Sequence, residues 1–286
     1  MKIRGFMIPF YICKFFNKFF PLPSHPFNLN NEGISTYSRW QYEKGAETIK
    51  FYLERFTIED MFKDKTVVDI GCGAAGKTLY YASLGVNKIY GVEVLQKYEK
   101  EAIELAESLQ LSDKFTFITA DAAKLPFEDN SVDTIIMNDA MEHVDDPELV
   151  LKECIRVLTK GGKIFINFPP YYHPFGAHLS DAIGIPWVHM FFSEKTLIKV
   201  YVDAIKNMPD AKDREDFRIS YKDEKPYFSY INKMTVSRFK RIMKNLDINP
   251  SYYKEVPLRN FFIPLSKTPS VKEMFVKMVV CVIEEN

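Results

Sequence analysis

The sequence of 286 residues has no net charge, because 38 Lys and Arg residues are matched by 38 Asp and Glu residues. A chain without a net field does not attract nucleic acid over long range, so we expect no nucleic-acid partner. Only four cysteines are present, and none forms a CxxC pair: Cys13, Cys72, Cys154 and Cys281. This usage is typical of reduced thiols in a cytoplasmic protein and gives no sign of a disulfide framework or a zinc site.

Long apolar runs are also missing, since none approaches the ~20 residues of a membrane-spanning helix, and no internal repeat is present. The N-terminal stretch MKIRGFMIPFYICKFFNKFFPLP is aromatic and basic, but Pro9, Lys14 and Lys18 interrupt it. No small-residue cleavage site follows. One helical face collects the side chains of Ile12, Phe15, Phe16, Phe19 and Phe20. Two interpretations stay open: a helix packed over the core, or an interfacial anchor through residues 1–21 that contacts a membrane surface.

Between residues 46 and 168, short apolar runs alternate with amphipathic runs. The runs typical of buried strands are TVVDI (66–70), KIYGVEV (88–94), FTFITA (115–120), VDTIIMN (132–138) and GGKIFINF (161–168). The runs between them have helical spacing, as does GAETIKFYLERF, which precedes the first strand. Such alternation predicts a doubly wound, mostly parallel Rossmann-like sheet with helices on both faces. Ligands bind at the carboxyl ends of the strands in this architecture.

After residue 168 the alternation stops. Residues 169–233 are rich in proline, aromatic and charged side chains, and a helix (TVSRFKRIMKNLD) and two strands (SYYKEVPL and MVVCVIEE) follow. Long insertions into compact domains usually form lids or binding elements. We therefore expect an N-terminal helical cap segment (1–45) and one α/β domain (46–286). Its sheet has seven strands with an antiparallel last strand, and a lid insertion covers 169–233.

The stretch DIGCGAAG (69–76) contains the spacing G-x-G-x-x-G, which alone suits a dinucleotide-binding loop. Asp69, however, precedes the first glycine, and a diphosphate ~4 Å from it would cost about 4 kcal/mol at an effective dielectric near 20. A cationic ligand reverses the sign of this interaction. A sulfonium that carries an amino acid and an adenosine fits best, and its expected contacts here are Asp69, Gly71, Cys72, Gly73 and Gly76.

Acidic residues follow the next two strands. Glu93, with Val94 after it, ends the second strand, where an acid holds ribose hydroxyls in NAD and S-adenosylmethionine alike. Asp121 follows the third strand and can accept a hydrogen bond from an adenine amino group, while the Ala122 N–H can donate to the ring. A helix N-cap role competes for Asp121. These residues indicate a nucleoside site without deciding its chemistry.

Taken together, VVDIGCGAAGKT, YGVEV, ADAAKLPFEDNSVDTIIMNDAMEHVDD and LKECIRVLTKGGKIFINFPP resemble class I S-adenosylmethionine-dependent methyltransferases of the type 11 small-molecule group. The similarity covers 46 to about 170 well and the last two strands loosely. It implies S-adenosylmethionine as cofactor, Asp69 and Gly71 at its methionine part, Glu93 at the ribose and Asp121 at the adenine. It also implies Asn138 beside the sulfonium. The usual glycine pattern, G-x-G-x-G, differs here because Ala75 takes the third place and Gly76 follows it.

Methyl transfer to an alcohol needs a general base, and a histidine paired with an aspartate suits that task. We therefore predict catalytic roles for His173, His178, Asp181 and His189. His143, in the EHV element, is expected to order its loop. The spacing of the lid histidines is too irregular to indicate a metal site. NFPPYY (167–172) is expected to turn the chain into the lid, because the similar motif of amino-methylating enzymes follows the fourth strand.

The sequence thus predicts a cytoplasmic methyltransferase, adjacent to a membrane under the second interpretation of residues 1–21. It acts on a small-molecule or glycan- or lipid-linked acceptor, with oxygen as the preferred nucleophile. Two alternatives stay open: an NAD-dependent oxidoreductase, and a catalytically silent cofactor-binding partner protein. The acceptor and the oligomeric state do not follow from the sequence.

Overall fold

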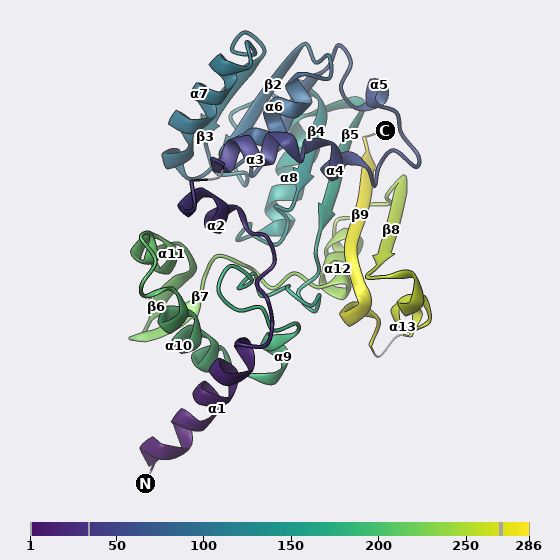
Figure 1. Cartoon of the computed structure of the whole chain (residues 1–286). Coiled ribbons are helices and arrows are strands. Elements are labelled where there is room, and N and C mark those ends of the chain that lie inside the picture. Colours follow the sequence, from purple (N-terminus) through teal and green to yellow (C-terminus); the bar gives the residue numbers. More distant parts are fainter. Residues whose placement is uncertain (1, 34, 269–270, 286) are drawn as a thin grey trace.

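The computed structural model describes residues 2–33, 35–268 and 271–285 and contains a seven-stranded sheet (Figure 1). The strand order is β3-β2-β1-β4-β5-β9-β8. The strands are β1 (Thr66–Ile70), β2 (Lys88–Glu93), β3 (Phe115–Thr119), β4 (Val132–Asn138), β5 (Leu158–Phe168), β8 (Tyr252–Pro257) and β9 (Val276–Glu284). β9 runs antiparallel to both β5 and β8, whereas the pairs among β1 to β5 are parallel. The expected sheet, with its antiparallel last strand, is confirmed.

Two apolar cores lie on the two faces of this sheet, because successive side chains of a strand point to opposite faces. Val68 and Ile135 pack into one core, with α8 (Pro147–Val157) and α12 (Val236–Asn245). Val67 and Ile136 pack into the other, with α6 (Gly76–Ala82) and α7 (Glu99–Ser108). Burial on both faces explains why these strands read as continuous apolar runs.

The helix expected over GAETIKFYLERF is shorter in the structure. α4 (Gly45–Ile49) ends after five residues, and turns lead from it to α5 (Ile58–Met61). Tyr52 lies in these turns and is fully buried in the second core. Tertiary packing of the tyrosine therefore sets the local conformation here rather than helical periodicity.

The chain between β5 and α12 forms a separate cluster beyond the carboxyl ends of the parallel strands (Figure 1). It contains α9 (Val188–Phe191), α10 (Glu194–Ile205), α11 (Ala211–Arg218) and the hairpin of β6 (Ile219–Lys222) and β7 (Lys225–Phe228). The cluster has its own apolar core. We call this segment, residues 169–233, the lid, and its role as a lid stays a prediction.

The N-terminal helices divide between the lid and the sheet. α1 (Lys2–Asn17) packs on the lid, where Cys13 is buried in the lid core and the Asn17 side chain bonds to Ala182 O and Gly184 N. α2 (Pro26–Asn31) follows, and α3 (Tyr37–Glu43) packs closely on α6. Figure 1 shows α1 extending away from the rest of the molecule.

Between β8 and β9 the chain makes a short excursion with η2 (Asn260–Phe262), α13 (Ile263–Lys267) and η3 (Lys272–Phe275). The remaining element is η1 (Gln96–Tyr98), which leads into α7. Over the described ranges, no helix has both the length and the apolar character to cross a bilayer.

Candidate active site

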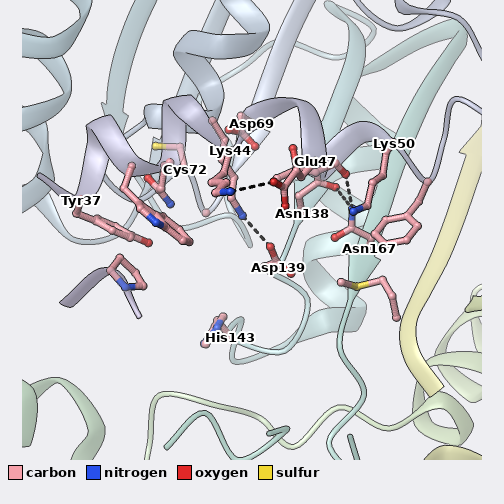
Figure 2. A pocket seen from close by; sticks show the side chains of 18 of the residues that line it. Tyr37, Lys44, Glu47, Lys50, Asp69, Cys72, Asn138, Asp139, His143 and Asn167 are labelled. Atoms are coloured by element: carbon pink, nitrogen blue, oxygen red, sulfur yellow. Dashed lines mark hydrogen bonds and ion pairs between the residues drawn. The ribbon is translucent and has the colours of Figure 1, made fainter. Parts of the chain in front are cut away.

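A cavity of about 500 Å³ lies between the carboxyl ends of β1, β4 and β5, the N-terminal helices and the lid (Figure 2). Asp69 and Gly71 line one end, and His143 and His178 line another part. α3 contributes Tyr37, Trp40 and Gln41. The cavity has the size of a small-molecule site, and the strand topology positions it where ligands bind in this fold.

The glycine loop that follows β1 is shaped by three residues with positive φ. Gly71 (φ +70°) approaches the next loop so closely that a Cβ there would lie 2.9 Å from Ala140 Cβ. Gly73 (φ +54°) faces the ring of Tyr37, 3.4 Å from where a Cβ would stand. Ala75 takes the left-handed conformation (φ 58°) just before α6. The departure from G-x-G-x-G therefore places a non-glycine residue at a left-handed position, at a modest conformational cost.

Asp69 is buried at the end of β1 and accepts a 2.6 Å hydrogen bond from the Thr78 hydroxyl. Burial raises the pKa of this carboxyl group to about 7, against the lowering effects of Thr78 and Lys77. A buried carboxylate disfavours its charged form unless a cation approaches. Asp69 therefore suits a cationic ligand, in line with the expectation from the sequence.

The other residues expected at the nucleoside lie at the edge of this region. Both Glu93 oxygens accept backbone hydrogen bonds, one from Gly73 N and one from Leu95 N, each at 3.0 Å. Asp121 accepts from Ala123 N at 2.9 Å and is exposed, and Val94 is exposed. Ala122 is half-buried, and Cys72 and Gly76 are buried in the loop and the first turn of α6. The structure thus gives Glu93 a loop-holding contact, and its ribose role stays a prediction.

Asn138 ends β4 inside a buried hydrogen-bond network. Its Oδ1 accepts from the Tyr52 hydroxyl and from Asn167 Nδ2, both at 2.6 Å, and its Nδ2 donates to the Tyr81 hydroxyl at 3.0 Å. Asn138 and Asn167 both line the cavity. The network fixes the carboxyl ends of β4 and β5 beside Gly71, which is where the sequence predicted a residue next to the reacting centre.

A partly buried ion pair in the cavity was not predicted from the sequence. Lys77 Nζ of α6 lies 2.7 Å from Asp139 Oδ2, and both residues line the cavity; Figure 2 shows Asp139 below Asn138. Asp139 raises the pKa of Lys77, although burial opposes this. The sequence indicated this ion pair only through the position of Lys77, which directly follows the glycine loop. The pair closes the space between these two loops.

His143 and His178 line another part of the cavity, and the centroids of their rings lie 5.0 Å apart. Burial lowers the pKa of both imidazoles, so they are neutral near pH 7. Glu142, which the sequence analysis did not single out, lies beside them: its Oε1 is 3.9 Å from His143 Nε2 and 3.8 Å from His178 Nε2. The lid holds this loop through Asn232, whose backbone N donates to Glu142 O and whose side chain donates to Met141 O and Val144 O.

The other three residues expected to be catalytic lie elsewhere in the lid, outside the lining of this cavity. Asp181 is fully buried and pairs with Arg214 at 3.0 Å and Arg218 at 3.1 Å. His173 accepts a bond from the backbone N of Phe175, and His189 packs against the ring of Tyr171. Their catalytic roles stay predictions, and the contacts of Asp181 indicate a structural role.

The cavity fits S-adenosylmethionine in the features that the described residues show. A Cβ at Gly71 would collide with Ala140, so only glycine fits at this point of the loop, and a nearby cation would favour the ionised form of the buried Asp69 carboxyl group. Asp69 and Gly71 would hold the amino-acid part of the cofactor. Tyr37 would cover the loop at Gly73, since its ring already packs there.

Comparisons with known proteins agree with this geometry. Residues 68–166 match a family described as "Methyltransferase domain". Tocopherol O-methyltransferase from Arabidopsis thaliana is 37% identical over 108 residues, which are 38% of this chain and 31% of that protein. Norajmaline N-methyltransferase from Rauvolfia serpentina is 33% identical over 104 residues, which are 36% of each chain. The match therefore spans about a third of the length of these relatives.

Among solved structures, a SAM-dependent methyltransferase from Aquifex aeolicus has a TM-score of 0.51 at 15% identity. The alignment covers 92% of this chain and all of that one (100%). At this identity the likeness concerns the fold, and it extends over the lid and the C-terminal strands as well as the matched domain.

Proposed function

The chain contains a class I methyltransferase domain of the type 11 group, and on that premise we propose that it transfers a methyl group from S-adenosylmethionine to a small-molecule or glycan-type acceptor. The observation that carries the proposal is the single cavity that joins Asp69 and Gly71 to His143 and His178. It provides an anionic end for a cationic cofactor and a second part for an acceptor. The named relatives methylate oxygen in one case and nitrogen in the other, so they do not decide the acceptor atom.

When bound, S-adenosylmethionine supplies an electrophilic methyl group. The residues of this chain would position the reactants, since holding nucleophile and methyl group in line lowers the barrier. Asp69 would bind the ammonium, and the Asn138 network would fix the floor of the site. The imidazole of His178 is neutral and can accept a proton from an acceptor hydroxyl. This proton acceptor is why oxygen is our preferred nucleophile.

Binding of S-adenosylhomocysteine and NADH to the purified full chain tests the cofactor. We expect a calorimetric signal with S-adenosylhomocysteine only, weakened about 10-fold or more by Asp69→Ala, because a hydrogen bond to a charged group contributes roughly 1.5–3 kcal/mol. Glu93→Ala should weaken it too. Binding of NADH alone would replace the proposal by the oxidoreductase alternative.

Turnover tests the acceptor side. With acceptor pools that include sugars and lipid extracts, S-adenosylhomocysteine should accumulate above background. His178→Ala should lower this turnover and leave cofactor affinity unchanged, while His173→Ala provides a comparison from outside the lining of the cavity. If no pool is methylated although the cofactor binds, the protein is a cofactor-binding partner protein. Unchanged turnover in His178→Ala removes this histidine from the mechanism.

We also propose that α1 attaches the protein to a membrane surface, which would bring a lipid-linked acceptor close to the cavity. Cys13 faces the lid, whereas Tyr11, Phe15 and Phe19 stand 59%, 56% and 66% exposed. Lys18 is exposed among them, as expected for a helix in a lipid interface. α9 and α13 lie at the same end of the molecule, and each has an exposed phenylalanine in or beside it, Phe191 and Phe261 (Figure 1).

Co-sedimentation with anionic vesicles tests the membrane contact. Phe15→Ser with Phe19→Ser should lower the vesicle partition constant roughly 30-fold or more, because burying each exposed ring contributes about 1–2 kcal/mol. These substitutions leave Cys13 and Asn17 on the lid, so the fold is kept, unlike in a deletion of 1–21. Equal binding of the two proteins would end the proposal.

A further inference from the structure

Three side chains at the acceptor part of the cavity bring their ligand atoms together. One ligand atom each from Glu142, His143 and His178 lies within 4.8 Å of the other two. Around an ion at 2.0–2.2 Å, tetrahedral ligand atoms are ~3.4 Å apart. The measured separations of 3.8 and 3.9 Å from Glu142 Oε1 would therefore close by about half an ångström, which small side-chain rotations can supply.

The carboxylate of Glu142 lacks the partners that a buried carboxylate needs. Only 3% of the residue is exposed, and neither Oε1 nor Oε2 has a hydrogen-bond partner among the described residues. The nearby cation Lys77 is paired with Asp139, and the charge of Asp139 disfavours the ionised form of Glu142 further. Buried charges in proteins are normally paired or coordinate metals.

The imidazole of His143 is oriented for coordination. His143 Nδ1 lies 2.7 Å from the carbonyl oxygen of Tyr230. A carbonyl can only accept, so in the neutral ring Nδ1 carries the proton and Nε2 holds the lone pair. Metal-bound histidines usually donate their other N–H to a carbonyl or carboxylate in this way. Tyr230 belongs to the lid, so lid and loop together orient the ring.

We propose that Glu142, His143 and His178 bind a divalent transition-metal ion, such as Zn²⁺, that activates the acceptor. Two imidazoles and one carboxylate suit such ions and leave coordination positions open. This inference rests on the proposed function and deepens it, and it departs from our expectation of no metal. Of the lid histidines only His178 belongs to this cluster, and the other two ligands come from the loop after β4.

An ion at this position would change how the acceptor hydroxyl is activated. Coordination lowers the pKa of a bound hydroxyl, so its proton can pass to solvent without a histidine base. The oxygen then forms a bond to the methyl carbon as the methyl–sulfur bond breaks, and the electron pair stays on sulfur. An acceptor with an ionisable hydroxyl, such as a phenol or a sugar, fits this role best.

Co²⁺ titration of the full chain, treated with a chelator beforehand, tests the site directly. We expect one equivalent to produce visible absorption that Zn²⁺ then abolishes by displacement. Glu142→Gln and His178→Ala should each weaken binding at least about tenfold. His189→Ala is the matched control, because this histidine lies in the lid near Tyr171, and it should bind Co²⁺ as the unaltered chain does.

Calorimetry with S-adenosylhomocysteine on the same samples separates the two proposals. Cofactor binding without any Co²⁺ signal would overturn the metal site and leave the methyltransferase proposal standing. A Co²⁺ signal without cofactor binding would overturn the methyltransferase proposal and leave the metal site standing. Co²⁺ affinity that is unchanged in Glu142→Gln, in a sample that still binds the cofactor and is therefore folded, would also overturn the metal site.

Discussion

Cofactor affinity should depend on pH through Asp69. Burial raises the pKa of this carboxyl group to about 7, and only its ionised form attracts the ammonium of the cofactor. The histidines that line the cavity have lowered pKa values: the pKa of His25 lies at about 4, and burial lowers the pKa of His143 and His178. Acidification should therefore weaken binding by protonating Asp69.

The magnitude follows from the ionised fraction. With a pKa of about 7, roughly three quarters of Asp69 is ionised at pH 7.5 and roughly 3% at pH 5.5. The apparent dissociation constant varies inversely with the competent fraction, so it should rise about 25-fold over this interval. Below pH 7 the slope approaches tenfold per pH unit, and the ammonium of the ligand stays protonated throughout.

Isothermal calorimetry with S-adenosylhomocysteine at several pH values measures this dependence. Asp69→Asn is the matched control: it has no charge to lose, so it should bind weakly and equally from pH 5.5 to 7.5. A dissociation constant of the unaltered protein that stays constant over this range would refute the reasoning. So would an equal pH dependence in the Asn variant.

Three further changes test the structure. Without ligand, Asp69→Asn should raise Tm. The gain should increase with pH from about 3.8, the ordinary pKa of the carboxyl group, to about 7 and stay constant above that, because a raised carboxyl pKa costs the folded state stability as pH rises. Asp181→Asn breaks the buried pairs with Arg214 and Arg218, which should cost about 3–5 kcal/mol and lower Tm by roughly 10 °C. The cofactor affinity of Asp181→Asn should not change. Loss of turnover at an unchanged Tm would instead support a catalytic role for Asp181. Asn232→Ala removes two hydrogen bonds to the loop after β4 and should cost about 1–3 kcal/mol in urea unfolding; Asn245→Ala, exposed at the end of α12, should be neutral.

The sheet could be predicted because each strand carries its signal locally. Val68, Ile135 and Ile164 sit in short apolar runs with turn signals on both sides, and burial on both faces leaves few alternatives. The helix over GAETIKFYLERF was overestimated for the opposite reason. Its apolar periodicity is helical, but Tyr52 is needed at the Asn138 network, where its hydroxyl bonds to Oδ1.

The acceptor side could not be read from the sequence because it depends on contacts between distant segments. Glu142 and His143 lie in one loop, but His178 reaches them only through the path of the lid. Asp181 looked like a partner for a histidine, whereas the fold places two arginines of α11 against it. Periodicity describes neighbours along the chain, whereas His178 and the two arginines are distant in sequence from the residues that they approach.

The docking of α1 on the lid has a mechanical consequence. Cys13 and Asn17 tie the N-terminal helix to the lid core, and the sheet has two cores of its own. A pulling force applied to α1 therefore acts on the lid before it acts on the sheet. Hydrogen exchange should accordingly follow this division, with amides of α1 and α10 opening as one cooperative unit while β4 and β5 remain closed.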